Sequence, residues 1–181
     1  DYVGAISDLE TMIARGFIAG ENVKSTYYNI AQLYLTTDNK EKSLEYYDRW
    51  MSVGGVPDRS QKWTLAVLYQ QMDRFPEALN WAEQVFQDDG PGAERQVYDF
   101  LIFLYDKTGN FAKKAELLEI LLARDPSDRQ LWDAIAGDYF RGGQDRKAFE
   151  VQKAMYLAGL LQTEDELMRI VNFYNTFDVP S

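Results

Sequence analysis

The sequence predicts an all-α fold, an α-solenoid in which helix–turn–helix hairpins of similar length follow one another along the chain. A tyrosine recurs at nearly constant spacing, apolar residues surround each tyrosine at helical periodicity, and turn-forming residues separate the periodic segments. The tyrosines stand at positions 34, 69, 105, 139 and 174, so the intervals are 35, 36, 34 and 35 residues. A fixed period of this length is typical of stacked helical repeats, in which each unit buries its apolar face against its neighbours.

The first helix of each unit is predicted from the residues that precede the tyrosine. A pair of small or apolar residues lies three or four positions earlier, which places the pair and the tyrosine on one helical face. The pairs are Ile30-Ala31, Leu65-Ala66, Leu101-Ile102, Ile135-Ala136 and Ile170-Val171. We therefore expect Tyr34, Tyr69, Tyr105 and Tyr139 to lie in the core.

The second helix of each unit is predicted from a small residue nine positions after the tyrosine, where two helices approach closely. Ser43, Ala78 and Ala148 occupy this place in the first, second and fourth units. The third unit departs from the pattern, because Lys114 stands there and Ala115 follows one residue late. We expect a local adjustment of that helix, with the repeat retained.

Turn chemistry divides the chain into these units. Gly, Asn and Asp favour tight turns, and Ser, Thr and Asp favour helix starts. The predicted turns within hairpins are Asp38-Asn39, Asp73-Arg74, Gly109-Asn110 and Gly142-Gly143, and the joints between units are 54–58, 88–92 and 125–128. Thr163 is a further predicted N-cap. The result is one domain, 1–181, with a lone second helix (1–20), four units (24–57, 59–92, 95–128 and 129–162) and a lone first helix (164–181). Both ends interrupt the pattern, so we expect a piece of a longer solenoid.

Composition argues against catalysis and against several ligand classes. The chain has no cysteine and no histidine, which removes thiolate chemistry and the usual general base near neutral pH. No phosphate-binding loop or hydrolase motif occurs. The net charge of −10 disfavours nucleic acid and favours a basic partner. No apolar run reaches the roughly 20 residues of a membrane span. We predict no enzyme activity, no cofactor, no metal and no direct membrane insertion, and no oligomeric state is indicated.

The fourth unit resembles the tetratricopeptide repeat (TPR) family. It has Trp132, Ile135, Ala136, Tyr139, Gly143 and Ala148 at the core, turn and close-contact places of that pattern. The resemblance implies a right-handed solenoid whose first helices line a concave face that binds a segment of a partner protein. Carried over to this sequence, the candidate binding residues are Tyr28, Gln32, Trp63, Val67, Gln70, Asp99, Phe103, Asp106, Asp133 and Phe140. Trp63 and Phe103 are the favoured anchors, whereas the cationic clamp of chaperone-tail-binding members is not present.

A narrower resemblance concerns residues 68–83 and the terminal Asp178-Val179-Pro180. These segments are similar to periplasmic TPR proteins encoded beside the TonB, ExbB and ExbD energy-transduction components of Gram-negative bacteria. That resemblance implies an exported accessory of a TonB-type system. Two alternatives stay open, namely a cytoplasmic adaptor or assembly module and a helical accessory domain of a larger enzyme.

Overall fold

A computed structural model describes residues 2–161 and 163–177, with the side chains of 173, 174, 176 and 177 excepted. These residues form ten α-helices and a short 3-10 turn, and they contain no strand, which confirms the predicted all-α class. The chain divides into two compact units, residues 1–88 (unit 1) and 89–181 (unit 2). Each unit is described by itself.

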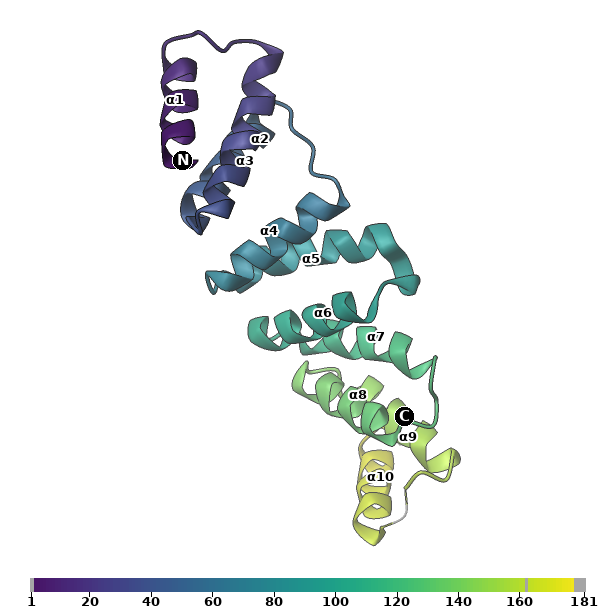
Figure 1. Ribbon diagram of the computed structural model, residues 1–181. Helices are drawn as coiled ribbons and strands as arrows, with labels where there is room; N and C mark the ends of the chain where they lie inside the picture. The colour runs from purple at the N-terminus through teal and green to yellow at the C-terminus, as the bar shows by residue number, and fades with distance from the viewer. Residues whose placement is uncertain (1, 162, 178–181) are drawn as a thin grey trace. The chain divides into compact units, whose positions relative to one another are not determined.

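Unit 1 holds the first five helices, and unit 2 holds the 3-10 turn and the other five (Figure 1). The helices of unit 1 are α1 (Tyr2–Ala14), α2 (Glu21–Thr36), α3 (Lys40–Ser52), α4 (Arg59–Gln71) and α5 (Phe75–Asp89), whose last residue crosses the boundary. Unit 2 contains η1 (Gly90–Gly92), α6 (Arg95–Thr108), α7 (Phe111–Leu122), α8 (Arg129–Arg141), α9 (Asp145–Leu157) and α10 (Glu164–Phe177). Among the described residues, no helix is long and apolar enough to cross a membrane.

The four turns within hairpins share one backbone geometry, and the repeated tyrosine is part of it. The turn residue has a positive φ in every case: 56° at Asp38 and Asp73, 71° at Gly109 and 70° at Gly143. The next residue then donates its N–H to the carbonyl of the tyrosine five positions earlier. These bonds run from Asn39 to Tyr34, Arg74 to Tyr69, Asn110 to Tyr105 and Gln144 to Tyr139, at 2.8–2.9 Å. The left-handed turn residue reverses the chain direction. The N–H group of the next residue then satisfies a carbonyl that has no partner within the helix.

Side-chain caps form at three of the predicted helix starts. Asp58 makes a capping box with Gln61 at the start of α4. Asp128 accepts from two backbone N–H groups at the start of α8, and Thr163 exchanges hydrogen bonds with Glu166 at the start of α10. The joint predicted at 88–92 differs, because α5 extends to Asp89, η1 occupies 90–92 and the residue before α6 makes no side-chain cap.

The small-residue places bring paired helices together as predicted. Ser43, Ala78 and Ala148 are buried, and the Ser43 hydroxyl donates to the Ala31 carbonyl on the preceding helix at 2.9 Å. Ala115 is fully buried within an uninterrupted α7, so the repeat continues through the irregular third unit. The local adjustment that we expected is therefore a one-residue shift of the contact.

Three of the four tyrosines that we assigned to the core are buried, namely Tyr69, Tyr105 and Tyr139. The prediction of a core position was wrong for Tyr34, because its side chain is only partly buried. It lies at the contact with α1, a helix in which Ile6 is the buried residue. The side chain of Tyr174 lies outside the described residues.

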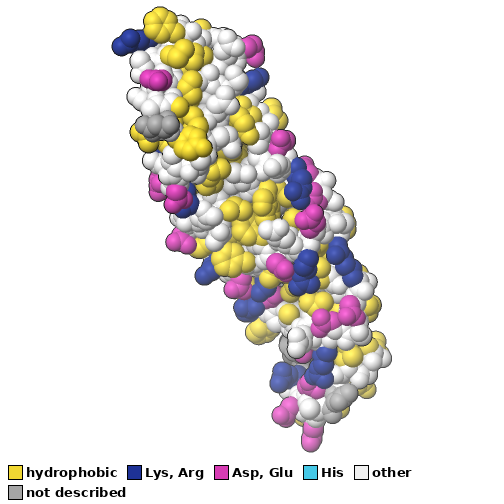
Figure 2. Space-filling view, in the orientation of Figure 1, with side chains coloured by type: hydrophobic (Ala, Val, Ile, Leu, Met, Phe, Trp, Pro, Cys, Tyr) yellow, Lys and Arg dark blue, Asp and Glu magenta, His cyan; other side chains and the backbone are white. Residues whose placement is uncertain are grey.

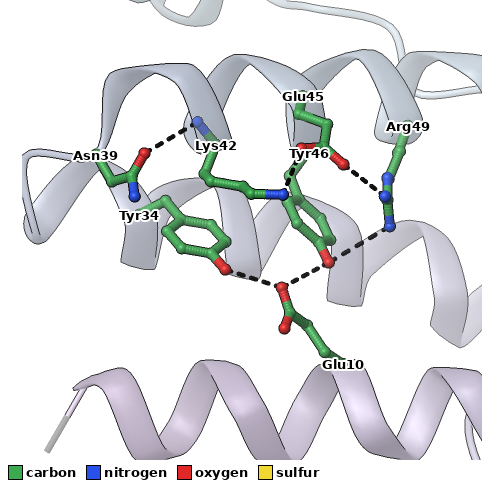
Figure 3. A network of polar contacts seen from close by, with 7 residues as sticks. All are labelled: Glu10, Tyr34, Asn39, Lys42, Glu45, Tyr46 and Arg49. Atoms are coloured by element: carbon green, nitrogen blue, oxygen red, sulfur yellow. Dashed lines mark hydrogen bonds and ion pairs between the residues drawn. The ribbon is translucent and has the colours of Figure 1, made fainter.

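A polar network attaches α1 to the α2–α3 hairpin (Figure 3). The Glu10 carboxylate accepts hydrogen bonds from the hydroxyls of Tyr34, at 2.9 Å, and Tyr46, at 2.8 Å. Burial together with the Glu10 carboxylate raises the pKa of Tyr34 to about 12. Both hydroxyls therefore keep their protons and donate to Glu10 across the ordinary pH range.

Candidate protein-binding surface

The structure divides the ten candidate residues equally between the two units. Unit 1 contains Tyr28 and Gln32 on α2 and Trp63, Val67 and Gln70 on α4, and all five are partly buried. Unit 2 contains Asp99, Phe103 and Asp106 on α6 and Asp133 and Phe140 on α8, and all five are exposed. The more exposed part of the candidate surface therefore lies on the first helices of unit 2.

Tyr28 and Gln32 are engaged within their own hairpin. The Tyr28 ring lies 6.0 Å from the Tyr47 ring in an edge-to-face arrangement and 5.4 Å from the Trp50 ring, both on α3. The Gln32 amide donates to the Tyr47 hydroxyl. Aromatic pairs at these separations add to packing energy, so both residues help to hold α2 against α3.

Phe103 and Phe140 leave large apolar surfaces open to solvent in unit 2. The Phe103 side chain is 38% exposed and that of Phe140 is 59% exposed. The Lys107 ammonium lies 5.6 Å from the centre of the Phe103 ring, within the range of a cation–π contact. Both rings keep apolar surface accessible outside the core, which is the property expected of a residue that anchors a partner.

The three acidic candidates already have cationic partners. Asp99 pairs with Arg95 at 2.8 Å, Asp106 with Lys114 at 2.8 Å and Asp133 with Arg129 at 3.6 Å. The hydrogen bond from Lys114 holds the pKa of Asp106 below its usual range. Figure 2 shows basic and acidic side chains lying next to one another over α6 to α10. The acidic candidates of unit 2 are therefore paired with cations and do not form a continuous acidic stripe.

Sequence reasoning missed a buried charge in unit 2. Asp138 on α8 is fully buried, and its Oδ2 lies 3.5 Å from the Lys114 ammonium without accepting a hydrogen bond from any described residue. Arg141 pairs with the other carboxylate oxygen and also stacks 4.4 Å over the Phe111 ring. Lys114 stands where the other units have a small residue, and its ammonium offsets the negative charge of Asp138 on the next helix. The departure at Lys114 was the one sequence signal that could have indicated this pair.

A cleft of about 500 Å³ lies between α8, α9 and α10. Ala136, Gly137 and Ala148 give it apolar surface, and Phe140 flanks it. Gln152 and Arg169 add polar groups to the same cleft. Its volume is within the range of pockets that hold a small ligand or an anchoring side chain. The sequence did not indicate this hollow, although it borders on the predicted residue Phe140.

Acidic side chains in the part of the chain that the structure describes take part in ion pairs and helix caps. No group of three or more His, Cys, Asp and Glu side chains in that part is arranged to hold a metal ion. Asp88, in the last turn of α5, instead contributes an ion pair, because its carboxylate contacts the Lys62 ammonium at 2.6 Å. The acidic start of α10 is part of the cap made by Thr163 and Glu166.

The hairpins, their shared turn geometry and the buried close-contact residues define an all-α repeat fold of the tetratricopeptide type. No family model and no curated protein sequence matches the chain. A solved structure of MamA, labelled AMB-1, aligns with a TM-score of 0.51 and 16% identity, over 92% of this chain and 87% of that one. At that identity the likeness extends to the fold alone.

Two further solved structures align less closely. A putative kinesin light chain from Podosopora anserina, described as having nearly identical TPR-like repeats, has a TM-score of 0.47 and 17% identity, over 90% of both chains. A tetratricopeptide repeat protein from Parabacteroides merdae has a TM-score of 0.44 and 16% identity, over 86% of this chain and 58% of that one.

Proposed function

We propose that the chain is a protein-binding scaffold whose first helices in unit 2 bind a segment of a partner protein. The observation that carries this proposal is the exposure of Phe103 and Phe140 on α6 and α8, while the tyrosines of the same helices are buried. Exposed aromatic side chains surrounded by polar groups are typical of binding surfaces, in which a few anchors supply most of the energy.

Charge gives the proposed partner a preferred character. The net charge of −10 attracts basic proteins over distances of about a Debye length, roughly 10 Å at 0.1 M salt. At close range the acidic side chains are paired with Lys and Arg, and exposed pairs of this kind are worth at most about 1 kcal/mol. A basic segment can therefore displace them. We propose that charge steers the partner and that the two phenylalanines hold it.

Site-specific photo-crosslinking tests this proposal. A photoreactive phenylalanine analogue at position 103 or 140 is expected to crosslink the same partner in a Gram-negative lysate. The matched control is the analogue at Glu150, an exposed position on the second helix α9. Equal crosslinking from positions 150, 103 and 140 would contradict binding through the first helices. Mass spectrometry of the crosslinked species identifies the partner.

We further propose that the scaffold is a periplasmic accessory of a TonB-type energy-transduction system. The support is the sequence resemblance in residues 68–83, which form the end of α4 and the first part of α5. The resembling terminus at 178–180 lies outside the described residues. Crosslinks to TonB, ExbB or ExbD and recovery in the periplasmic fraction are expected. Recovery of the protein in the cytoplasm would favour the adaptor, and a catalytic domain in the same gene would favour the accessory domain of an enzyme.

A further inference from the structure

Alignment of the first helices on their tyrosines shows an irregularity at Gly137. The position two residues before the tyrosine is Gln32 in α2, Val67 in α4 and Phe103 in α6. In α8 the same position is Gly137. Helix α8 therefore lacks a side chain at a position where α2, α4 and α6 each have one.

Neither packing nor backbone geometry requires glycine at this position. A Cβ atom added to Gly137 would meet no other atom within 4 Å, and its φ is not positive. Glycine inside a helix is unfavourable relative to alanine, because it loses more conformational freedom on folding. The contrast is Gly142 on the same hairpin, where a Cβ would come within 2.8 Å of the Ala112 nitrogen. Gly137 therefore has a cost in stability that no contact inside the protein explains.

The absent side chain opens the cleft described above. Gly137 lines it together with Ala136 and Ala148, which are small and buried, and the exposed Phe140 ring lies beside them. Glycine commonly occurs where a ligand approaches the backbone closely. This part of the cleft can accept a large apolar group without displacing any side chain of the protein.

The charges at the cleft favour a neutral occupant. Asp133 and Glu166 line it, but Arg129 pairs with both carboxylates. Arg169 also lines the cleft and is exposed at its edge, where water weakens a charge contact. Next to Gly137 the cleft is lined by Ala136, Ala148 and the Phe140 ring, and the one charge a helical turn away, that of Asp133, is paired with Arg129. An aromatic ring placed there would pair favourably with the Phe140 ring.

We propose that the Gly137 cleft receives one aromatic side chain of the bound partner segment. The proposal rests on the proposed function of unit 2 and adds to it the position and the chemistry of the principal anchor. The partner segment contributes a neutral aromatic residue to this cleft, while its basic residues meet the acidic side chains around it.

Nuclear magnetic resonance titration of the whole chain tests the proposal with N-acetyl-L-phenylalaninamide as the probe and N-acetyl-L-alaninamide as the control compound. We expect saturable shifts of the Gly137 and Phe140 amide signals with the aromatic probe and none with the control compound. Gly137→Gln places in α8 the residue that α2 has, so it fills the cleft and improves helix propensity. It is expected to weaken probe binding at least tenfold without lowering Tm. Ala134→Gln, an exposed change on the same helix, is the matched control and leaves the affinity unchanged.

Two results would overturn the proposal: no saturable shift in the unchanged protein, or equal probe affinity in Gly137→Gln. Gly137→Ala provides a second variant, because its Cβ meets open space and the fold is retained. A Gly137→Ala protein with higher Tm and weaker probe binding supports the proposal. Crosslinking from position 140 reports separately on the proposed function, so an unoccupied cleft and an absent partner are distinguishable.

Discussion

Replacement of Lys114 by methionine is expected to destabilise unit 2, because it leaves Asp138 as a buried carboxylate with one remaining cation. Methionine keeps the apolar stem and removes the ammonium. The Lys114 side chain is 13% exposed, and its Nζ lies 3.5 Å from Asp138 Oδ2. Two unit charges at that distance attract by roughly 5 kcal/mol at an effective dielectric constant of 20.

The remaining Arg141 and local relaxation reduce this value. Breaking a buried pair by removing one partner costs about 3–5 kcal/mol. Because Arg141 still contacts the other carboxylate oxygen, we expect a loss of about 2–3 kcal/mol for Lys114→Met. Asp106 loses an exposed partner as well, which adds at most about 1 kcal/mol.

Urea unfolding followed by circular dichroism measures the loss, and hydrogen exchange of α7 and α8 amides assigns it to unit 2. The double variant Lys114→Met/Asp138→Asn is expected to recover at least half of the loss, since no charge is then buried. Lys113→Met on the exposed side of α7 is the matched control, with a change within about 0.5 kcal/mol. A loss below about 1 kcal/mol in the single variant, or no recovery in the double variant, would refute the reasoning.

Three further changes follow from the structure. Gly142→Ala is expected to lower stability by about 1–3 kcal/mol in thermal unfolding, because the new Cβ would lie 2.8 Å from the Ala112 nitrogen; an unchanged Tm would contradict this contact. Asp73→Gly is expected to raise stability by about 0.5–1 kcal/mol, because Asp73 has a φ of 56°, and a lower Tm would contradict it. Burial raises the pKa of Tyr47 to about 12. The unfolded chain therefore loses this proton first, near pH 10, and the stability present below pH 10 falls by about 2 kcal/mol as the pH rises to 12. Urea midpoints in Tyr47→Phe should fall less over that interval.

Local chemistry explains why the hairpins were predictable. Each turn depends on residues within one short segment, so Asp38 and Gly109 indicate a left-handed helix end wherever the chain lies in space. Asp128 and Thr163 cap helices through backbone groups two or three residues away. Tyr139 is apolar in bulk and stands at helical spacing from Ile135, which places both on the buried face.

Contacts between helices explain what sequence reasoning missed. The register of Tyr28 predicts a place on the binding surface and gives no sign that its ring also packs against Tyr47 and Trp50 on the next helix. Tyr34 is predicted in the core, but the helix that covers it is α1, in which Ile6 is the buried residue. Helical spacing specifies the direction in which a side chain leaves the helix axis, whereas the exposure of that side chain depends on the neighbouring helix.

The sequence by itself determined the all-α class, the period, the turns and most of the buried tyrosines, because each depends on interactions within one hairpin. Only the tertiary structure decided that Lys114 neutralises Asp138, since these residues belong to different hairpins. It alone revealed that Gly137 opens a cleft, because a missing side chain becomes a hollow only when two other helices enclose it.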